Sequence, residues 1–317
     1  MNILLFMILM SITMAISSNS WFSIWISLEM NTMLFIMMLL NKKNQQFIES
    51  AMKYFLIQTI SSIILIFSSF YMNDNYLNKM MLIMMISMIM KMGMFPFHFW
   101  YIEVLPKMKW MNVFMMMTLQ KIIPMMLMMY IMKKINLTMM FSLIMINVII
   151  SSINMMNQTN MKKIMGFSSM NQMGWMVMSM MMNTMTWVMF MIIYLMINFT
   201  VLNYFMKMKI YKLNQMMMMS SMMMSVTILS MAGLPPFSGF MIKWIIIQQM
   251  MMKSMIIMSL IMIFSSVVNM YIYLRMISAN FMKSKMMMKW KMKNNNQNMM
   301  MMFTSTITLP IFMMMFM

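Results

Sequence analysis

Four charged side chains lie inside long apolar runs of the sequence: Glu29, Lys91, Lys121 and Lys243. A charge in the middle of a bilayer costs roughly 2.5–3.5 kcal/mol, and charges at that depth commonly mark proton or ion pathways. Burial favours the neutral forms of Lys and Glu, whereas pairing favours their charged forms. The four residues are therefore candidates for a proton-transfer relay. In the alternative interpretation they form fixed ion pairs, or reach the interface, and only hold helices together.

Glycine and proline interrupt the apolar runs beside two of these lysines. Lys91 precedes Gly93 and Pro96, and Lys243 follows Gly233 and the pair Pro235 and Pro236. Unsatisfied backbone groups cost several kcal/mol in hydrocarbon, so a broken helix is tolerated only where protein or a water-filled cavity surrounds it. The pattern predicts two broken helices, and their similarity suggests two related halves.

Polar side chains without a titratable group recur in the same runs. They could anchor water between distant lysines, or form hydrogen bonds between helices. The sequence leaves both open for Gln58, Ser61, Ser62, Ser168, Ser169, Asn171 and Gln172.

Several side chains near the ends of runs have simpler interpretations. The single histidine, His98, could be a group at which protons enter or leave, but a satisfied interfacial residue is the preferred interpretation. Tyr54, Trp110 and Trp175 are expected in the aromatic belt at the membrane surface.

Composition indicates the elements that must position these residues. The chain has 317 residues, of which 63% are hydrophobic and only 9% charged, so we predict an all-α polytopic membrane protein with one transmembrane domain, 1–317. A bilayer core needs about 20 apolar residues per helix. We predict eleven spans, at 3–18, 21–40, 52–72, 79–97, 110–132, 137–155, 164–182, 184–206, 219–250, 254–275 and 299–317.

Basic residues are distributed unequally between the two predicted sides of the membrane. Loops on the side of the N-terminus hold sixteen Lys and Arg residues, and loops on the other side hold four. The positive-inside rule then places the N-terminus inside and, with an odd number of spans, the C-terminus outside. The basic segment 283–298 is a connection on the inner side, either a surface helix or a solvated linker.

Composition also excludes several kinds of chemistry. The absence of Cys excludes thiolate-ligated iron–sulfur clusters, and a single His makes a multi-histidine metal or haem site improbable. The five glycines form no nucleotide-binding motif. The net charge of +19 comes from short clusters between apolar runs, so no nucleic-acid partner is expected.

Four stretches of the sequence form a further set of motifs: Trp21–Phe35, Glu49–Ser62, Lys91–Val104 with the following Leu119–Pro124, and Gly233–Gln248. In these stretches the sequence resembles one family, the antiporter-like chain 2 subunits of NADH–ubiquinone oxidoreductase, mitochondrial respiratory complex I. Phe167–Trp175 is a fifth, looser match, and the composition is typical of an invertebrate mitochondrial gene.

The resemblance implies an eleven-helix antiporter-like fold with inverted repeats and broken helices. It implies that Glu29 and Lys91 form the pair that gates proton loading, that Lys121 is the central relay, and that Lys243 is the terminal proton site. Gln172 stands where many relatives carry His, so the resemblance implies only a water-anchoring role there. Gln248 lies near where some relatives carry Glu, which is a departure from the family at the exit charge.

The resemblance also implies the setting of the chain. It would be a multi-pass protein of the mitochondrial inner membrane, with its N-terminus in the matrix and its C-terminus in the intermembrane space. It would carry no cofactor, with FMN, iron–sulfur clusters and ubiquinone bound by other subunits. Its partners would be other membrane subunits, including neighbouring antiporter-like ones, and phospholipids.

Two rival functions stay open at this point. The first is a cation/proton antiporter of the related sodium-transporting assemblies. The second is a structural spacer subunit without its own proton path, which predicts that the four charges tolerate neutral replacements.

Overall fold

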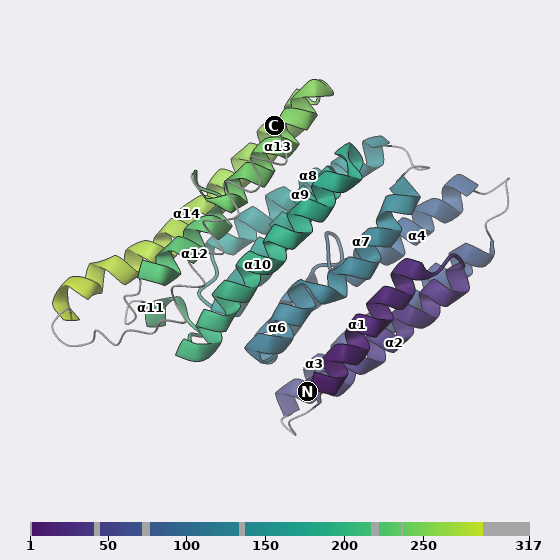
Figure 1. Cartoon of the computed structure of the whole chain (residues 1–317), viewed down its shortest axis with the longest axis horizontal. Helices are drawn as coiled ribbons and strands as arrows, with labels where there is room; N and C mark the ends of the chain where they lie inside the picture. The colour runs from purple at the N-terminus through teal and green to yellow at the C-terminus, as the bar shows by residue number, and fades with distance from the viewer. Residues whose placement is uncertain are drawn as a thin grey trace. The chain divides into compact units, whose positions relative to one another are not determined.

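The structure, a computed structural model, describes residues 2–40, 45–71, 77–132, 137–216, 222–235 and 237–287 (Figure 1). These residues form helices and short connections and include no β-strand. Six stretches are long and apolar enough to cross a membrane. The helical class is therefore as predicted, but the expected total of about eleven spans is not confirmed. The last predicted span, 299–317, and most of the connection 283–298 lie outside the described residues.

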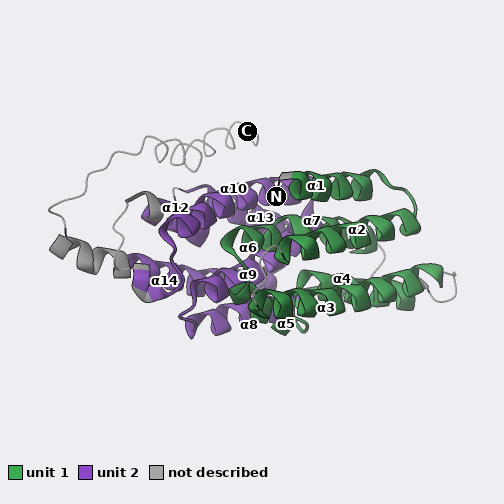
Figure 2. Ribbon diagram, turned by 90° about the horizontal axis from the view of Figure 1, so that it is seen from below, with its two compact units in different colours: residues 1–143 green, residues 144–317 purple. Residues whose placement is uncertain are grey.

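The chain divides into two compact units, residues 1–143 and 144–317 (Figure 2). In unit 1, α2 packs against α1 and α3, and α4 packs against α3 and α7. The beginning of α8 (Leu137–Met156) also belongs to this unit. Its elements are α1 (Asn2–Ser17), α2 (Trp21–Leu39), α3 (Gln45–Phe70), α4 (Leu77–Met92), α5 (Phe99–Val104), the 3-10 turn Leu105–Lys107, α6 (Trp110–Met117) and α7 (Leu119–Met132).

Unit 2 contains the rest of α8 and six further helices. The short α13 packs against α9, α10, α12 and α14, so it lies inside this group of helices. The elements are α9 (Met161–Met182), α10 (Thr184–Met208), α11 (Leu213–Met216), α12 (Met222–Ala232), α13 (Ser238–Met252) and α14 (Ile256–Met287).

The helix predicted to break at Gly233 is broken there. α12 has 11 residues and α13 has 15, so neither reaches the length of about 20 residues that spans a bilayer core. Gly233 has a φ of 78°, in the left-handed region that L side chains avoid. Gly93, with a φ of 66°, ends α4 in the same way.

A third break, which the sequence analysis missed, divides the predicted span 110–132. α6 ends at Met117 and α7 begins at Leu119, with Thr118 between them at φ −121° and ψ −79°. The Thr118 hydroxyl donates to the Phe114 carbonyl at 2.6 Å. This side-chain bond competes with the regular helical pattern, as Thr can do.

At each end of unit 2, hydrogen bonds join loops and helix ends that are distant in the sequence. The Met161 amide donates to the Tyr211 carbonyl at 2.9 Å, and the Arg275 guanidinium donates to the Met156 carbonyl at 3.1 Å. At the opposite end, the Lys253 amine donates to the Met181 carbonyl at 3.2 Å. This grouping agrees with the predicted alternation of α9, α10 and α14 across the membrane. The compartment at each end stays a prediction.

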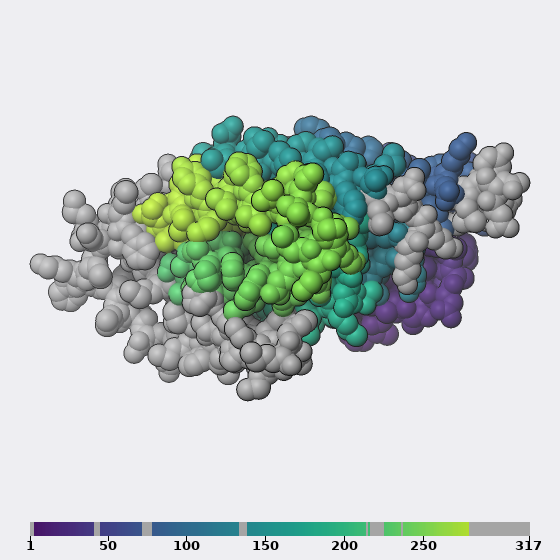
Figure 3. All heavy atoms as spheres, turned by 90° about the horizontal axis from the view of Figure 1, so that it is seen from above, coloured from purple at the N-terminus to yellow at the C-terminus, as the bar shows by residue number. Residues whose placement is uncertain are grey.

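α14 is visible in the space-filling view (Figure 3), and large apolar side chains lie on its surface. Ile257, Leu260 and Phe264 are among its exposed residues. Large exposed apolar surface is expected where lipid or another membrane subunit replaces water.

Candidate functional site

In unit 1, Glu29 on α2 and Lys91 on α4 lie within electrostatic range of one another. They do not form a direct ion pair, and the Lys91 amine, on a side chain that is 5% exposed, has no hydrogen-bond partner among the described residues. The backbone is held more firmly, because the Gln58 amide donates to the Lys91 carbonyl at 3.2 Å. The structure thus places Glu29 and Lys91 within electrostatic range of one another, without a direct contact between the carboxylate and the amine.

Lys121 lies in the first turn of α7, directly after the break at Thr118. Its side chain is 3% exposed, and its amine lies 4.7 Å from the centroid of the Tyr101 ring. Cation–π contacts of this kind hold an ammonium without a carboxylate. The absence of a side chain on Gly93 makes room for this ring, because a β-carbon there would lie 2.7 Å from the β-carbon of Tyr101.

A hydrogen-bonded chain connects three helices of unit 1 beside these charges. The Tyr54 hydroxyl donates to the Gln120 side-chain oxygen at 3.1 Å, and the Gln120 amide donates to the Asn31 side-chain oxygen at 3.1 Å. Gln120 precedes Lys121, and Asn31 follows Glu29 by two positions. The sequence analysis missed this role of Gln120, although its place beside Lys121 within an apolar run was a usable signal.

Lys243 lies on α13, in the interior of unit 2. Its side chain is 7% exposed, its amine donates to the Ala232 carbonyl at 3.5 Å, and the centroid of the Trp175 ring is 5.8 Å away. Ala232 is the last residue of α12, so the broken helix supplies the carbonyl that accepts this bond. No ion pair between Lys243 and a carboxylate occurs in the described part of the chain.

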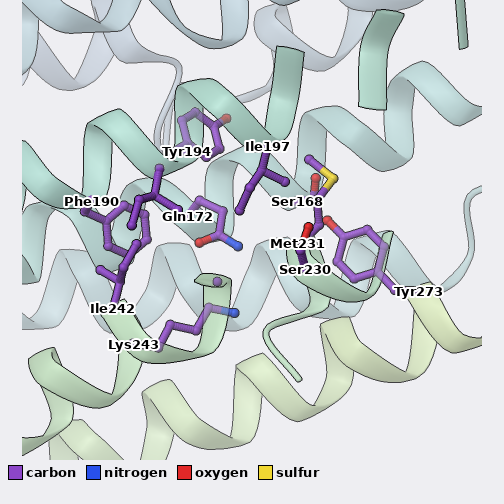
Figure 4. A pocket seen from close by; sticks show the side chains of 12 residues that line it. Ser168, Gln172, Phe190, Tyr194, Ile197, Ser230, Met231, Ile242, Lys243 and Tyr273 are labelled. Carbon is purple, nitrogen blue, oxygen red and sulfur yellow. The ribbon is translucent and has the colours of Figure 1, made fainter. Parts of the chain in front are cut away.

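A small cavity of about 30 Å³ adjoins Lys243 (Figure 4). Its polar lining comes from α9, α10, α12, α13 and α14, so it lies where five helices of unit 2 meet. Two of its lining residues, Ser168 and Gln172, are among those for which the sequence left water anchoring and hydrogen bonds between helices as alternatives. The other polar residues, Tyr194, Ser230 and Tyr273, were not singled out in the sequence. A single Ser or Tyr within an apolar run does not by itself indicate in the sequence that it lines a cavity.

The untitratable polar residues of the apolar runs differ in the hydrogen bonds that they form. Gln58 makes its bond across to α4, as the helix-to-helix interpretation requires. The hydroxyls of Ser61, Ser62, Ser168 and Ser169 donate to carbonyls of their own helices three residues earlier. Their oxygens can still accept hydrogen bonds, so the prediction that they anchor water stays untested.

The predicted aromatic belt is wrong for all three residues assigned to it. Tyr54 is 1% exposed, Trp110 4% and Trp175 0%. Tyr54 and Trp175 instead pack inside their units, beside the buried charges. His98 is also buried, and its ring interacts with the Pro96 backbone. Its expected place at the membrane interface stays a prediction.

In unit 1, an exposed ionic network joins α3 to α5 and to the 3-10 turn that follows α5. The Lys53 amine contacts Glu103 at 2.6 Å and Glu49 at 3.3 Å, and Lys107 also pairs with Glu49. The hydrogen bond from Lys53 lowers the pKa of Glu103. Surface pairs of this kind typically contribute at most about 1 kcal/mol. Within the described ranges, no group of three His, Cys, Asp or Glu side chains could hold a metal ion.

Comparisons with known proteins agree with this arrangement. Residues 18–269 match the family model described as NADH:quinone oxidoreductase/Mrp antiporter, TM. NADH-ubiquinone oxidoreductase chain 2 from Anopheles gambiae is 35% identical over 310 residues, which cover 91% of this chain and 89% of the relative. The chain of the same name from Locusta migratoria is 37% identical over 280 residues, or 84% and 81% of the two chains.

A solved structure shows the same fold. A chain in the structure of respiratory complex I from Thermus thermophilus with bound aureothin superposes with a TM-score of 0.83 and 15% sequence identity. The match covers 96% of the chain described here and 76% of the other. At this identity the similarity concerns the fold alone.

Proposed function

Because the chain belongs to the NADH:quinone oxidoreductase/Mrp antiporter transmembrane family, and within it to the chain 2 group of NADH-ubiquinone oxidoreductase, we propose that it conducts protons as an antiporter-like membrane subunit of respiratory complex I. One observation supports proton transfer above all. Lys91, Lys121 and Lys243 are each buried, and each lies beside an interrupted helix.

The contacts of these lysines argue against a purely structural role. A structural cation is expected in a fixed pair with a carboxylate, because an unpaired buried charge is costly. Lys91 and Lys243 form no such pair within the described residues, whereas exposed Lys53 does. Cations held by rings, carbonyls and distant charges can change their protonation at less cost than cations locked in ion pairs.

The mechanism follows from the arrangement inside unit 1. A proton gained or lost at Glu29 or Lys91 changes the electrostatic field at neighbouring groups, and this coupling is stronger in a poorly solvated interior than in water. Lys121 responds by binding or releasing a proton. The proton movement then continues to Lys243, the terminal site, in keeping with the order that the resemblance implies.

The redox chemistry lies elsewhere in the proposed complex. NADH oxidation and ubiquinone reduction would take place at FMN, iron–sulfur clusters and a quinone site of other subunits. This chain contributes titratable side chains, without a redox group of its own. Its exposed apolar helices would contact neighbouring membrane subunits, including antiporter-like ones, and phospholipids. No nucleic acid is involved.

The proposal places the chain in the mitochondrial inner membrane, with the N-terminus in the matrix and the C-terminus in the intermembrane space. The unequal distribution of Lys and Arg supports this orientation. Lys162, Lys212 and Arg275 all lie near the loop ends grouped at one end of unit 2, which would face the matrix.

Substitution of Lys121 by Met in the assembled complex tests the proposal. We expect K121M to assemble and to lose proton translocation, because Met fills a similar volume but holds no proton. The matched control is K79M, which removes an exposed lysine. Proton uptake into vesicles is the measurement, and full uptake by K121M would contradict the proposal.

The rival cation/proton antiporter shares the family but predicts a different coupling. Its transport would require sodium or potassium and would proceed without NADH oxidation. Proton translocation that depends on NADH and is indifferent to these cations would exclude it.

A further inference from the structure

Tyr273 lines the cavity beside Lys243, although it is not one of the four charged residues of the proposed relay. Its side chain is 2% exposed, whereas that of Tyr271, two residues earlier on the same helix, is 54% exposed. A buried tyrosine usually places its hydroxyl where it finds a polar partner. The Tyr273 side chain therefore lies in the interior of unit 2, whereas the Tyr271 side chain lies at the surface.

Two serine hydroxyls accompany Tyr273 in the cavity. Figure 4 shows Ser168, Ser230 and Tyr273 together, on the side toward which the Lys243 amine extends. Ser168 donates its proton to the Met165 carbonyl at 2.8 Å, and Ser230 donates to the Thr227 carbonyl at 2.7 Å. Their oxygens can accept further bonds but have no proton left to pass on. The Tyr273 hydroxyl lies within hydrogen-bonding range of Ser168, and among these three residues only Tyr273 has a hydroxyl proton that is not donated to its own helix.

The size and lining of the cavity suit water. A volume of about 30 Å³ has room for roughly two or three molecules, since one water needs roughly 10–15 Å³ on this measure. A buried water is stable where it makes two to four hydrogen bonds. The amine of Lys243, the amide of Gln172 and the hydroxyls of Ser168, Ser230 and Tyr273 supply these partners.

Polar groups continue along α10 from Tyr194, which itself lines the cavity. The Tyr194 hydroxyl lies within interaction range of Ser169, Asn198 and Tyr273. Neither this hydroxyl nor the polar atoms of Asn198, a residue that is 0% exposed, make a hydrogen bond of regular geometry. Buried polar groups in folded proteins are nearly always satisfied by protein or by ordered water. Tyr194 and Asn198 therefore extend the place where water would bind from the cavity along α10.

We propose that Tyr273 is a relay residue that connects Lys243, through water in this cavity, to the end of unit 2 where Arg275 lies. The Lys243 ammonium gives a proton to a water, and that water gives one of its protons to the Tyr273 oxygen. Tyr273 releases its own hydroxyl proton to water beside Tyr194 and Asn198. The amine is left neutral, the tyrosine is unchanged, and one proton has moved. This inference rests on the proposed function, because it needs Lys243 to exchange protons.

The two tyrosines of α14 provide a matched test in the assembled complex. Y273F and Y271F each remove one hydroxyl and keep the ring, but only Y273F removes a hydroxyl from the cavity. We expect Y273F to slow proton translocation by roughly tenfold or more and to change the ratio of turnover in H₂O and D₂O, with Y271F unchanged in both. A purely structural role would lower the yield of assembled complex without altering the isotope ratio.

K243M separates this inference from the proposed function. If K243M loses translocation while Y273F behaves like Y271F, the relay role of Tyr273 is wrong and the proposed function stands. If K243M translocates protons normally, both are wrong. A cryo-EM map of the unmodified complex gives an independent answer, even if Y273F fails to assemble. Ordered water between Lys243 and Tyr273 supports the relay, and a dry cavity overturns it.

Discussion

Gly233 and Lys243 lie in contact across the break between α12 and α13. A β-carbon on Gly233 would be 3.0 Å from the Lys243 amine nitrogen and 3.5 Å from its Cδ. The glycine therefore has two roles. Its φ of 78° turns the chain out of α12, and its missing side chain leaves the space that the amine occupies. The break in the helix and the position of the charge depend on the same residue.

Substituting Gly233 by Ala should disturb both roles at once. The left-handed backbone costs a residue with a β-carbon about 1–2 kcal/mol, and the new methyl group displaces the amine from the Ala232 carbonyl. We expect G233A to lower the thermal stability of the complex modestly and its proton translocation strongly. A232G, one residue earlier, keeps the carbonyl and adds no bulk, so it should retain translocation. Equal translocation by the two variants would contradict this explanation.

The hydrogen-bonded chain of Tyr54, Gln120 and Asn31 predicts that two substitutions within it lower stability to different extents. Y54F removes one hydrogen bond, with an expected cost of about 0.5–1.5 kcal/mol. Q120L removes both bonds and leaves Tyr54 and Asn31 as buried groups without their partner, so it should destabilise the complex more than Y54F. Thermal inactivation of the two variants and of the double variant measures this. If Q120L is as mild as Y54F, the chain does not connect the three helices energetically.

The sequence was sufficient to predict the helical class and two of the three breaks, because hydropathy and Gly–Pro pairs are local signals. It did not predict the break at Thr118, since Thr is common inside helices and only the competing bond to Phe114 reveals its effect. The buried charges were also recognisable, because Lys and Glu are rare in apolar runs.

The surroundings of the charges were not recognisable from the sequence. Tyr54 and Trp175 were assigned to the membrane surface from their place near the ends of spans, but they are buried beside Gln120 and Lys243. Which face of a helix meets the interior depends on its neighbours, and α2, α3 and α9 have large apolar side chains on several faces. The spacing of apolar residues therefore does not single out the face that is buried.

Glu103 predicts a pH dependence at the surface of unit 1. The hydrogen bond from Lys53 lowers its pKa below the ordinary value of 4.5, so the pair stabilises the fold fully above that value. The contribution is lost as the pH falls through the lower pKa of the folded state. We expect E103Q to be slightly less thermostable than the unmodified complex at pH 7, with the difference shrinking toward zero in acid. A difference that grows as the pH falls would contradict the assigned pairing.

Lys91 predicts opposite effects on stability and on function. Its buried amine has no hydrogen-bond partner among the residues described, so its charge destabilises the fold. Replacement of buried charges by apolar residues of similar volume is often neutral or stabilising by about 1–4 kcal/mol. We expect K91M to keep or raise the thermal stability of the complex while proton translocation falls. Loss of translocation should be similar in E29Q and in the double variant E29Q/K91M, because the two residues act as one pair. A K91M complex that is much less stable but pumps normally would show that Lys91 has a structural role instead.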